Sequence, residues 1–378
     1  MVNLTINDLF HKKLKLVLII VGLTVSLFLI QYSAGMWNGV LTRCSSIIDK
    51  WDHDVWIRDE DNEEVFGSGY LDDEIYDKIK NLKEIEEINR LIYDYSRIET
   101  DEEIVECMIL GFELSSEEVE PWDIVKGNVD NLKDANTVIV DVSLKDIMEE
   151  TPKMGDKLTI GDVEVEIVGF CKNSRWMNTP FIWGSLETMR KTAPWAGNWS
   201  NTYAIKLAED ASIDDLEASI EEVKDVYQLK DMEILSSDEL RQNSYDFVVN
   251  EGGMGGSIYI LVFMGFFVGM IIISISTYQT VQEKIPEFGT LKAIGASKGF
   301  LNKMLIGQVL ILVSVSFWLA TLLTYVLGLF SQNAVIPIII HLPTTFLFYG
   351  LTIITSVFCS LIAIRKVHKI DPAVVFQG

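Results

Sequence analysis

Residues 258–303 read IYILVFMGFFVGMIIISISTYQTVQEKIPEFGTLKAIGASKGFLNK. The first part of this stretch, from Ile258 to Tyr278, contains no charged residue and is apolar almost throughout. About 20 such residues in a helix cross the hydrocarbon core of a bilayer, which is about 30 Å thick. The remainder is charged, contains glycine and ends where another apolar run begins. The stretch therefore predicts a membrane-spanning helix, a short connection and the start of a second span.

Three further runs share this length and composition, namely Leu14–Tyr32, Met304–Phe330 and Thr345–Ile364. None shows the polar face, repeated every 3.6 residues, that a helix on the surface of a soluble protein carries. A cleaved signal peptide is the alternative for the first run, although that run exceeds the usual apolar region of about 7–15 residues. We expect four membrane-spanning helices, at 14–35, 257–280, 304–330 and 345–364.

Charged residues are distributed unevenly between the segments that these helices separate. Residues 36–256 hold 21 of the 31 basic residues and 51 of the 55 acidic residues, a net charge of −30. The other segments together carry +6, and the outer loop 331–344 contains neither Lys nor Arg. Because basic residues in short loops mark the cytoplasmic side, we expect segment 1–13, the connection 281–303 and the tail 365–378 in the cytoplasm. Residues 36–256 then lie outside it, and their acidity argues against nucleic acid as a partner.

The segment 36–256 is long enough to bury its own core. Amphipathic helices are predicted at 71–82 and 213–226 from apolar residues at helical spacing. A β-hairpin is predicted around Gly161-Asp162, which separates residues 157–160 from an alternating run at 163–167. Further strands are predicted at 85–95, 103–111, 137–141 and 203–207. The fold class is therefore a membrane α-helical protein with a large mixed α+β domain inserted between its first and second helices.

Both ends of this domain are expected to extend the neighbouring membrane helices into a stalk, over 34–49 and 236–250. Four glycines follow the second extension, and each costs about 1 kcal/mol against helix formation. They predict a hinge or a close-packing site, and a merely flexible joint is the alternative. The four are Gly252, Gly253, Gly255 and Gly256.

The connection between the second and third spans carries an apolar pattern. Phe288, Leu291 and Ile294 recur at helical spacing, and Gly289 and Gly295 permit close approach of another chain. A helix that lies along the membrane surface and offers an apolar face to a partner fits this pattern. A solvated loop is the alternative.

The string EFGTLKAIGAS, Glu287 to Ser297, resembles the signature of MacB/FtsX-type ABC transporter permeases of the type VII superfamily, and it looks most like the DevC-like branch. The third and fourth spans and the tail Ile370–Ala373 resemble the same family, so the resemblance covers most of the chain. It implies a non-enzymatic, multi-pass permease subunit of the bacterial inner membrane with no cofactor of its own. A separate cytoplasmic ABC ATPase would bind ATP and Mg²⁺, and its hydrolysis of ATP would move the stalk and the periplasmic domain.

The resemblance also implies residue roles. Pro286 departs from the family, in which Arg is frequent at this position, although proline fits the first turn of a helix. A homodimer is expected, and the small-xxx-small pair Gly265 and Gly269 serves either that dimer or helix packing within one subunit. Segment 1–13 is expected to be an interfacial amphipathic helix on the lipid membrane. The segment that couples to the ATPase would comprise Pro286, Glu287, Phe288, Gly289, Thr290, Leu291, Lys292, Ala293, Ile294, Gly295 and Ala296.

Enzyme and metal sites receive little support. The sequence contains neither the phosphate-binding pattern Gly-x-x-x-x-Gly-Lys-Ser/Thr nor His-Glu-x-x-His. Asp52, His53 and Asp54 are adjacent, so they cannot all face one metal ion from a regular element. No metal site is therefore predicted. The cysteines lack metal-binding spacing and are expected to be buried free thiols, with at most one disulfide among the outer three; they are Cys44, Cys107, Cys171 and Cys359.

Tryptophans gather in the second half of the outer domain, at Trp176, Trp183, Trp195 and Trp199. They either pack in a core or form a surface for a partner or an apolar ligand. The leading functional expectation is export or extraction of an apolar or amphipathic substrate, with a periplasmic adaptor and an outer-membrane conduit as further partners. The alternative is mechanotransmission, in which the same motion activates a periplasmic partner such as a cell-wall hydrolase and nothing is transported.

Overall fold

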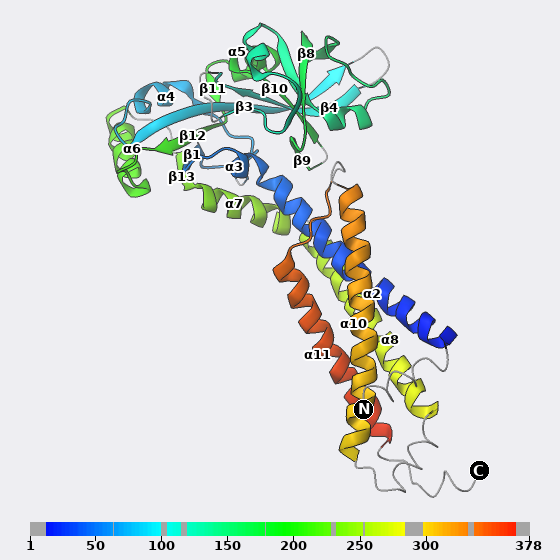
Figure 1. The fold of residues 1–378 in the computed structure, drawn as a ribbon. Coiled ribbons are helices and arrows are strands. Elements are labelled where there is room, and N and C mark those ends of the chain that lie inside the picture. The colour runs from blue at the N-terminus through cyan, green and yellow to red at the C-terminus, as the bar shows by residue number, and fades with distance from the viewer. Residues whose placement is uncertain are drawn as a thin grey trace, which may run out of the picture. The chain divides into compact units, whose positions relative to one another are not determined.

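The computed structural model describes residues 13–62, 64–99, 104–114, 119–177, 179–227, 232–251, 254–283, 298–331 and 336–367. The chain divides into two compact units, both visible in Figure 1. The helical unit comprises Met1–Gly39, Gly255–Gln332 and Pro337–Gly378. The α/β unit comprises Val40–Met254 and Asn333–Ile336.

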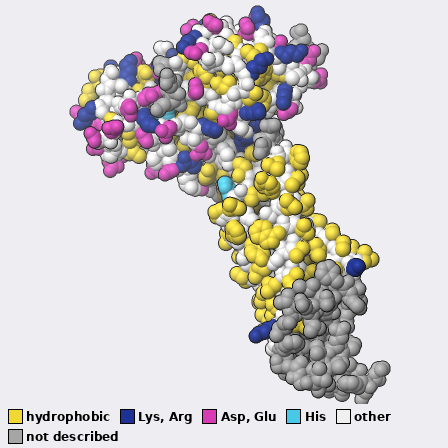
Figure 2. Space-filling model, viewed as in Figure 1, with side chains coloured by type: hydrophobic (Ala, Val, Ile, Leu, Met, Phe, Trp, Pro, Cys, Tyr) yellow, Lys and Arg dark blue, Asp and Glu magenta, His cyan; other side chains and the backbone are white. Residues whose placement is uncertain are grey.

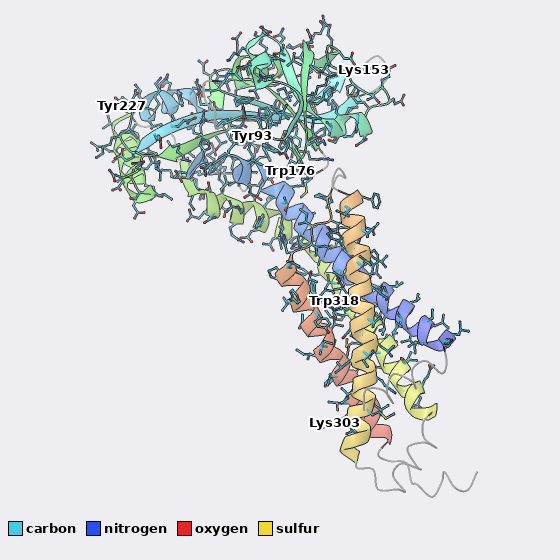
Figure 3. The ribbon with its side chains drawn as sticks, viewed as in Figure 1. Tyr93, Lys153, Trp176, Tyr227, Lys303 and Trp318 are labelled. Carbon is cyan, nitrogen blue, oxygen red and sulfur yellow. The ribbon has the colours of Figure 1, made fainter. Side chains whose placement is uncertain are left out.

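Within the described residues, the helical unit is built from α2 (Lys13–Cys44), α8 (Met254–Glu283), α10 (Lys298–Phe330) and α11 (Leu342–Val367). Each of these helices contains a stretch that is long and apolar enough to cross a membrane. The predicted number of membrane-spanning helices is therefore confirmed as four candidate spans. Hydrophobic side chains make up most of the described part of the face of this unit that Figure 2 shows, as lipid contact requires. Trp318 lies on α10 within one of the spans (Figure 3).

The four helices share one buried cluster. It draws on every helix of the unit, and its members include Leu23, Ile273, Val313 and Cys359. Buried hydroxyl groups in this unit donate mostly to main-chain carbonyls, as Ser316 Oγ does to Ile20 O at 3.3 Å. Such internal bonding is expected where no water is available to pair with a polar group.

A mixed β-sheet forms the centre of the α/β unit, in the order β13-β1-β12-β3-β4-β10-β6-β8-β5. β7 pairs with β3 and β8, β9 pairs with β10, and β2 pairs with β11. β10 runs parallel to β4, and β6 runs parallel to β8. The long strand β3 pairs with β12 through its first half and with β4 through its second half. The strands are β1 Val55–Asp59, β2 Leu71–Asp72, β3 Ile85–Glu99, β4 Ile104–Phe112, β5 Ile124–Gly127, β6 Thr137–Asp141, β7 Lys157–Ile160, β8 Val163–Cys171, β9 Arg175–Trp176, β10 Thr179–Ser185, β11 Trp199–Ser200, β12 Thr202–Leu207 and β13 Met232–Ser236.

Helices cover this sheet at two places, as Figure 1 shows. α4 (Asp73–Ile79) and α6 (Ile213–Tyr227) contact each other and bury a cluster with β1 and β12. α5 (Leu186–Thr192) contacts β4 and β10. Because apolar clusters lie on both faces of the central strands, residues that point to opposite faces of β10, such as Phe181 and Ile182, are both fully buried.

Most predicted elements of the outer domain are confirmed, as β3, β4, β6, β12, α6 and the hairpin β7–β8. The helix predicted at 71–82 is shorter. Leu71 and Asp72 instead form β2 against β11, and the Asp72 side chain then accepts a hydrogen bond from Glu74 N at 2.9 Å. A capping residue has extended backbone, so the helix begins only after it. Leu82 lies beyond the helix but still packs against the same cluster.

Two short helices of the α/β unit, α3 (Ser46–Lys50) and α7 (Ser237–Asp246), contact each other. Arg241 Nε on α7 donates to Asp49 Oδ1 on α3 at 2.9 Å. α7 begins at a capping box whose first residue is Ser236, which pairs two otherwise unbonded amides of the first turn. These helices occupy the two ends of the domain where a stalk was expected.

Candidate functional site

The predicted coupling segment, Pro286 to Ala296, lies outside the described residues, as do Gly252 and Gly253. Gly255 and Gly256 lie in the first turn of α8 and do not interrupt it. Because the two preceding glycines lie outside the described residues, the hinge at this run stays a prediction. The boundary between the two units nevertheless falls at this run, between Met254 and Gly255.

The pair Gly265 and Gly269 packs α8 against α2 of the same chain. Ser26 Oγ donates to Gly265 O at 2.7 Å. A Cβ atom on Gly265 would lie 2.6 Å from Ile30 Cγ1, and one on Gly269 would lie 3.1 Å from Ser26 Oγ. The absence of a side chain at both positions is therefore used for packing within one subunit.

Trp183 belongs to the core of the α/β unit. Its side chain is fully buried, its ring stacks edge-on against Trp122 and Phe181, and its Nε1 donates to Ser174 Oγ at 2.6 Å. Trp183 therefore cannot contribute to a partner surface, because β10 is a central strand covered on both faces.

The other tryptophans of that group lie on different elements. Trp199 on β11 is 43% exposed and contacts Tyr70 edge-on. Trp176, labelled in Figure 3, lies on β9, is half-buried and contacts Tyr95 and Phe66. The side chain of Trp195 is not described. The three described tryptophans therefore do not form a single partner surface.

Asp52, His53 and Asp54 turn to separate partners. Asp52 pairs with Lys206 at 2.7 Å, whereas His53 is buried with its Nε2 3.1 Å from Asn89 Nδ2. Burial lowers the pKa of His53 to about 4. Among the residues that the structure describes, no group of three or more His, Cys, Asp or Glu side chains is arranged to hold a metal ion.

Acidification is expected to destabilise the α/β unit through His53. The unfolded state takes up a proton near the ordinary pKa of about 6.5, whereas the folded state takes it up only near pH 4. His53 therefore contributes full stability above about pH 6.5 and loses it as the pH falls toward 4, by about 2 kcal/mol between pH 7 and 4.5.

The measurement compares urea unfolding of the wild type and His53→Gln at both pH values, since glutamine can still accept from Asn89 and does not titrate. Carboxylates titrate equally in both proteins, so the difference between the two pH dependences isolates His53. Parallel dependences would contradict the expectation.

One open cleft of the α/β unit, about 610 Å³ in volume, lies beside α5. Its charged residues are already paired: Arg190 with Asp73, Lys191 with Glu187, and Glu113 with Arg90. Asp73 also accepts from Ser200 Oγ at 2.7 Å, so it joins α4, α5, β3 and β11. This arrangement joins the elements that surround the cleft. The lining residues are Phe112, Glu113, Leu114, Ser185, Leu186, Glu187, Arg190 and Lys191.

Side chains that could act as nucleophiles are poorly placed for catalysis. All four cysteines are free and buried, as expected, and burial raises the pKa of the Cys107 thiol to about 12. One Gly-x-Ser-x-Gly string runs from Gly295 to Gly299. In hydrolases that string lies on a turn from a strand of a central sheet to a helix. Here its last two residues, Lys298 and Gly299, lie in the first turn of α10 in the helical unit, and its first three residues lie outside the described part of the chain. It therefore supports no enzyme assignment.

Two family models match the chain. The model of the FtsX-like permease C-terminal region matches residues 259–372, and the model of the MacB-like periplasmic core domain matches residues 16–223, more than half of the chain. None of the curated proteins compared matches the sequence.

Solved structures with a similar fold include the periplasmic region of MacB from Actinobacillus actinomycetemcomitans, at 15% identity and a TM-score of 0.41, covering 51% of this chain and 92% of that one. The extracellular domain of the noncanonic ABC-type transporter YknZ from Gram-positive bacteria is similar at 13% identity and a TM-score of 0.37, covering 48% and 98%. The chain belongs to the MacB/FtsX family of ABC transporter permeases, as a non-catalytic membrane subunit with a periplasmic domain between its first two spans.

Proposed function

We propose that this permease transmits mechanical work from a separate cytoplasmic ABC ATPase to its periplasmic domain. The observation that carries the proposal is the course of α2, an unbroken helix from Lys13 to Cys44. Its residues up to Gly39 belong to the helical unit, and its last turn belongs to the α/β unit. A helix is stiff over this length, so a displacement of its membrane-spanning part reaches the last turn.

The partner ATPase binds ATP and Mg²⁺ and docks on residues 286–296, at the apolar stripe Phe288, Leu291 and Ile294. Two copies of the permease pair in the inner membrane, with both termini in the cytoplasm. The basic residues before α2, between α8 and α10, and after α11 support this orientation.

The substrate proposed for export or extraction is apolar or amphipathic. The candidate spans contain no charged residue between Lys15 and Arg43, in α8 from 255 to 276, in α10 after Lys303, or in α11 up to 361. Intramembrane ionisable residues mark the pathways of polar solutes and protons, so this composition favours a substrate that is not carried through the helices as an ion.

The same composition favours a second candidate, mechanotransmission without transport, in which the periplasmic domain activates a partner such as a cell-wall hydrolase. Purification of the intact complex from native membranes distinguishes the two. A periplasmic adaptor with an outer-membrane conduit in the complex would favour export, and a hydrolase or its activator would favour mechanotransmission.

Leu291→Asp is expected to abolish stimulation of the partner ATPase by the permease, because a carboxylate on the apolar stripe cannot be buried against the partner. ATP hydrolysis would be measured with the complex reconstituted in nanodiscs, and the rate should fall to that of the ATPase alone.

Thr290→Asp is the matched control, since it adds the same charge one position away from the stripe. It should retain most of the stimulation. Undiminished stimulation by Leu291→Asp would remove the coupling role from this segment.

A further inference from the structure

The last turn of α2 carries a buried arginine that donates two hydrogen bonds to one residue of the α/β unit. Arg43 is 4% exposed. Its Nη1 donates to the main-chain carbonyl of Asn173 at 2.9 Å, and its Nη2 lies 3.3 Å from the side-chain Oδ1 of the same residue. A planar guanidinium presents its donors in a fixed fork, so this two-point contact fixes the rotation of the helix end as well as its distance.

The residue that Arg43 holds lies in an uncommon backbone conformation. Asn173 has φ +59° and its neighbour across the turn, Asp123, has φ +52°. The two are joined by a bond from Asn173 Nδ2 to Asp123 Oδ2 at 3.1 Å, and Trp122 Nε1 donates to the same carbonyl as Arg43, at 3.1 Å. Asn and Asp adopt left-handed backbone more readily than other residues with a side chain, and the hydrogen bonds from Arg43 and Trp122 are among the contacts that hold Asn173 in it. Arg43 is therefore part of what holds these two turns, which precede β5 and β9.

Stability alone does not explain an arginine at this position. The nearby buried carboxylate, Asp141, accepts from Ser143 N and Ser174 N at 2.8 Å each and lies 3.9 Å from Arg175 Nε. Within the described part of the chain, Arg43 itself forms no ion pair and bonds only to neutral acceptors. Asp141 and Asp123 act on Arg43 electrostatically without contacting it, and burial lowers the pKa of its guanidinium to about 10, so burying this charge is costly compared with an apolar side chain of similar size. Compared with an apolar side chain, the guanidinium adds directional hydrogen bonds.

Other links from this end of α2 and from the following α3 are more exposed or less directional. Arg241 Nε of α7 donates to Asp49 Oδ1 of α3 at 2.9 Å, but both side chains are partly exposed. Lys50 on α3 pairs with Asp123 at 3.4 Å, but both side chains are about two-fifths exposed (42% and 41%), and pairs of that kind contribute little. Ile47, Ile48 and Trp51 pack into the central cluster of the α/β unit, which resists separation but does not set one rotation of the helix. The fork of Arg43 is a buried, two-point contact that restricts this rotation.

We propose that Arg43 is the positioning residue through which α2 acts on the periplasmic domain: its fork passes rotation or axial displacement of the helix to the turns at 122–123 and 172–174, and so to β5 and β9. This inference rests on the proposed function, because it names the residue through which the work enters the domain.

The test is hydrogen–deuterium exchange of the full permease with its partner ATPase in nanodiscs, with and without ATP and vanadate. Arg43→Met replaces the guanidinium with an apolar chain of similar reach. It should leave the domain folded, raise exchange in 122–127 and 172–177 by about tenfold without nucleotide, and abolish the ATP-dependent change in exchange there. Arg43→Lys retains one charge but not the fork and should give an intermediate result, which keeps the test decisive if the methionine variant does not fold.

Arg58→Met is the matched control. Arg58 is equally buried, at 4% exposed, but it lies on β1 and pairs with Glu233 on β13. Its variant should keep the ATP-dependent change at 172–177. An ATP response in Arg43→Met and Arg43→Lys as large as in the wild type would overturn the assignment. If the wild type itself shows no ATP-dependent change in the periplasmic domain, both the proposed function and the role of Arg43 fail. If the change is lost only in the Arg43 variants, the proposed function stands and Arg43 has the assigned role.

Discussion

Replacing Trp183 with alanine is expected to lower the free energy of unfolding of the α/β unit by about 4 kcal/mol. The side chain is fully buried, and the rings of Trp122 and Phe181 lie with their centroids 5.3 and 5.8 Å from its own. Removal of the indole also leaves the buried hydroxyl of Ser174 without its donor. The site cannot close around the gap, because β10 is paired along both edges, with β4 and β6.

Trp199→Ala is the matched substitution at the surface. Trp199 is 43% exposed and is the first residue of the two-residue strand β11, so its loss should cost less than about 1 kcal/mol. Pulse proteolysis in increasing urea, with the full chain in detergent micelles, reads the unfolding of the α/β unit without using tryptophan fluorescence. Equal midpoints for the two variants would place Trp183 outside the core.

The difference between these two tryptophans was partly readable in the sequence. Trp183 ends the apolar run Phe181, Ile182, Trp183, which shows no polar alternation. A strand covered on both faces reads in this way, so the run itself was a signal for the core. Trp199 stands among Asn, Gly and Ser, as a residue of a surface turn does. Closeness in sequence therefore does not indicate that two tryptophans share a surface.

Local elements were predictable and long-range pairings were not. The hairpin β7–β8 is closed by two residues, Gly161 and Asp162, so its turn chemistry lies within a single stretch of sequence. The parallel pairing of β10 with β4 joins Phe181 to Met108, and no periodicity in either strand specifies a partner so far along the chain. Which neighbour a buried strand pairs with depends on the packing of the whole domain.

The polar contacts that fasten the domain were missed for the same reason. Asp73 meets Arg90, Arg190 and Ser200 from three other elements, and each of these residues looks like an ordinary surface residue in the sequence. Arg43 had a local signal, since it follows a long uncharged run. That signal marks the end of a membrane helix and says nothing of Asn173, which lies 130 positions away.

The glycine pair of α8 is the case in which the sequence defined the chemistry but left the partner open, and the partner is testable. Gly265→Leu is expected to destabilise the helical unit by about 3 kcal/mol. A Cβ atom at this position would lie 2.6 Å from Ile30 Cγ1 and 3.5 Å from Ile30 N, so a side chain forces α8 away from α2. The separation also breaks the bond from Ser26 Oγ to Gly265 O, and lipid offers neither group a replacement.

Gly350→Leu on α11 is the control, because a Cβ atom there meets no atom within 4 Å. Both changes bring the same gain in helix propensity, so the difference between the variants isolates packing. Unfolding in detergent micelles with increasing SDS should separate them, with Gly265→Leu unfolding first.

The alternative is that Gly265 serves the contact between two permease copies. In that case Gly265→Leu and Gly350→Leu would unfold together at low protein concentration, while chemical cross-linking of the dimer would be lost only in Gly265→Leu. Because Ile30 and Ser26 already occupy the face that Gly265 offers, we expect the first outcome.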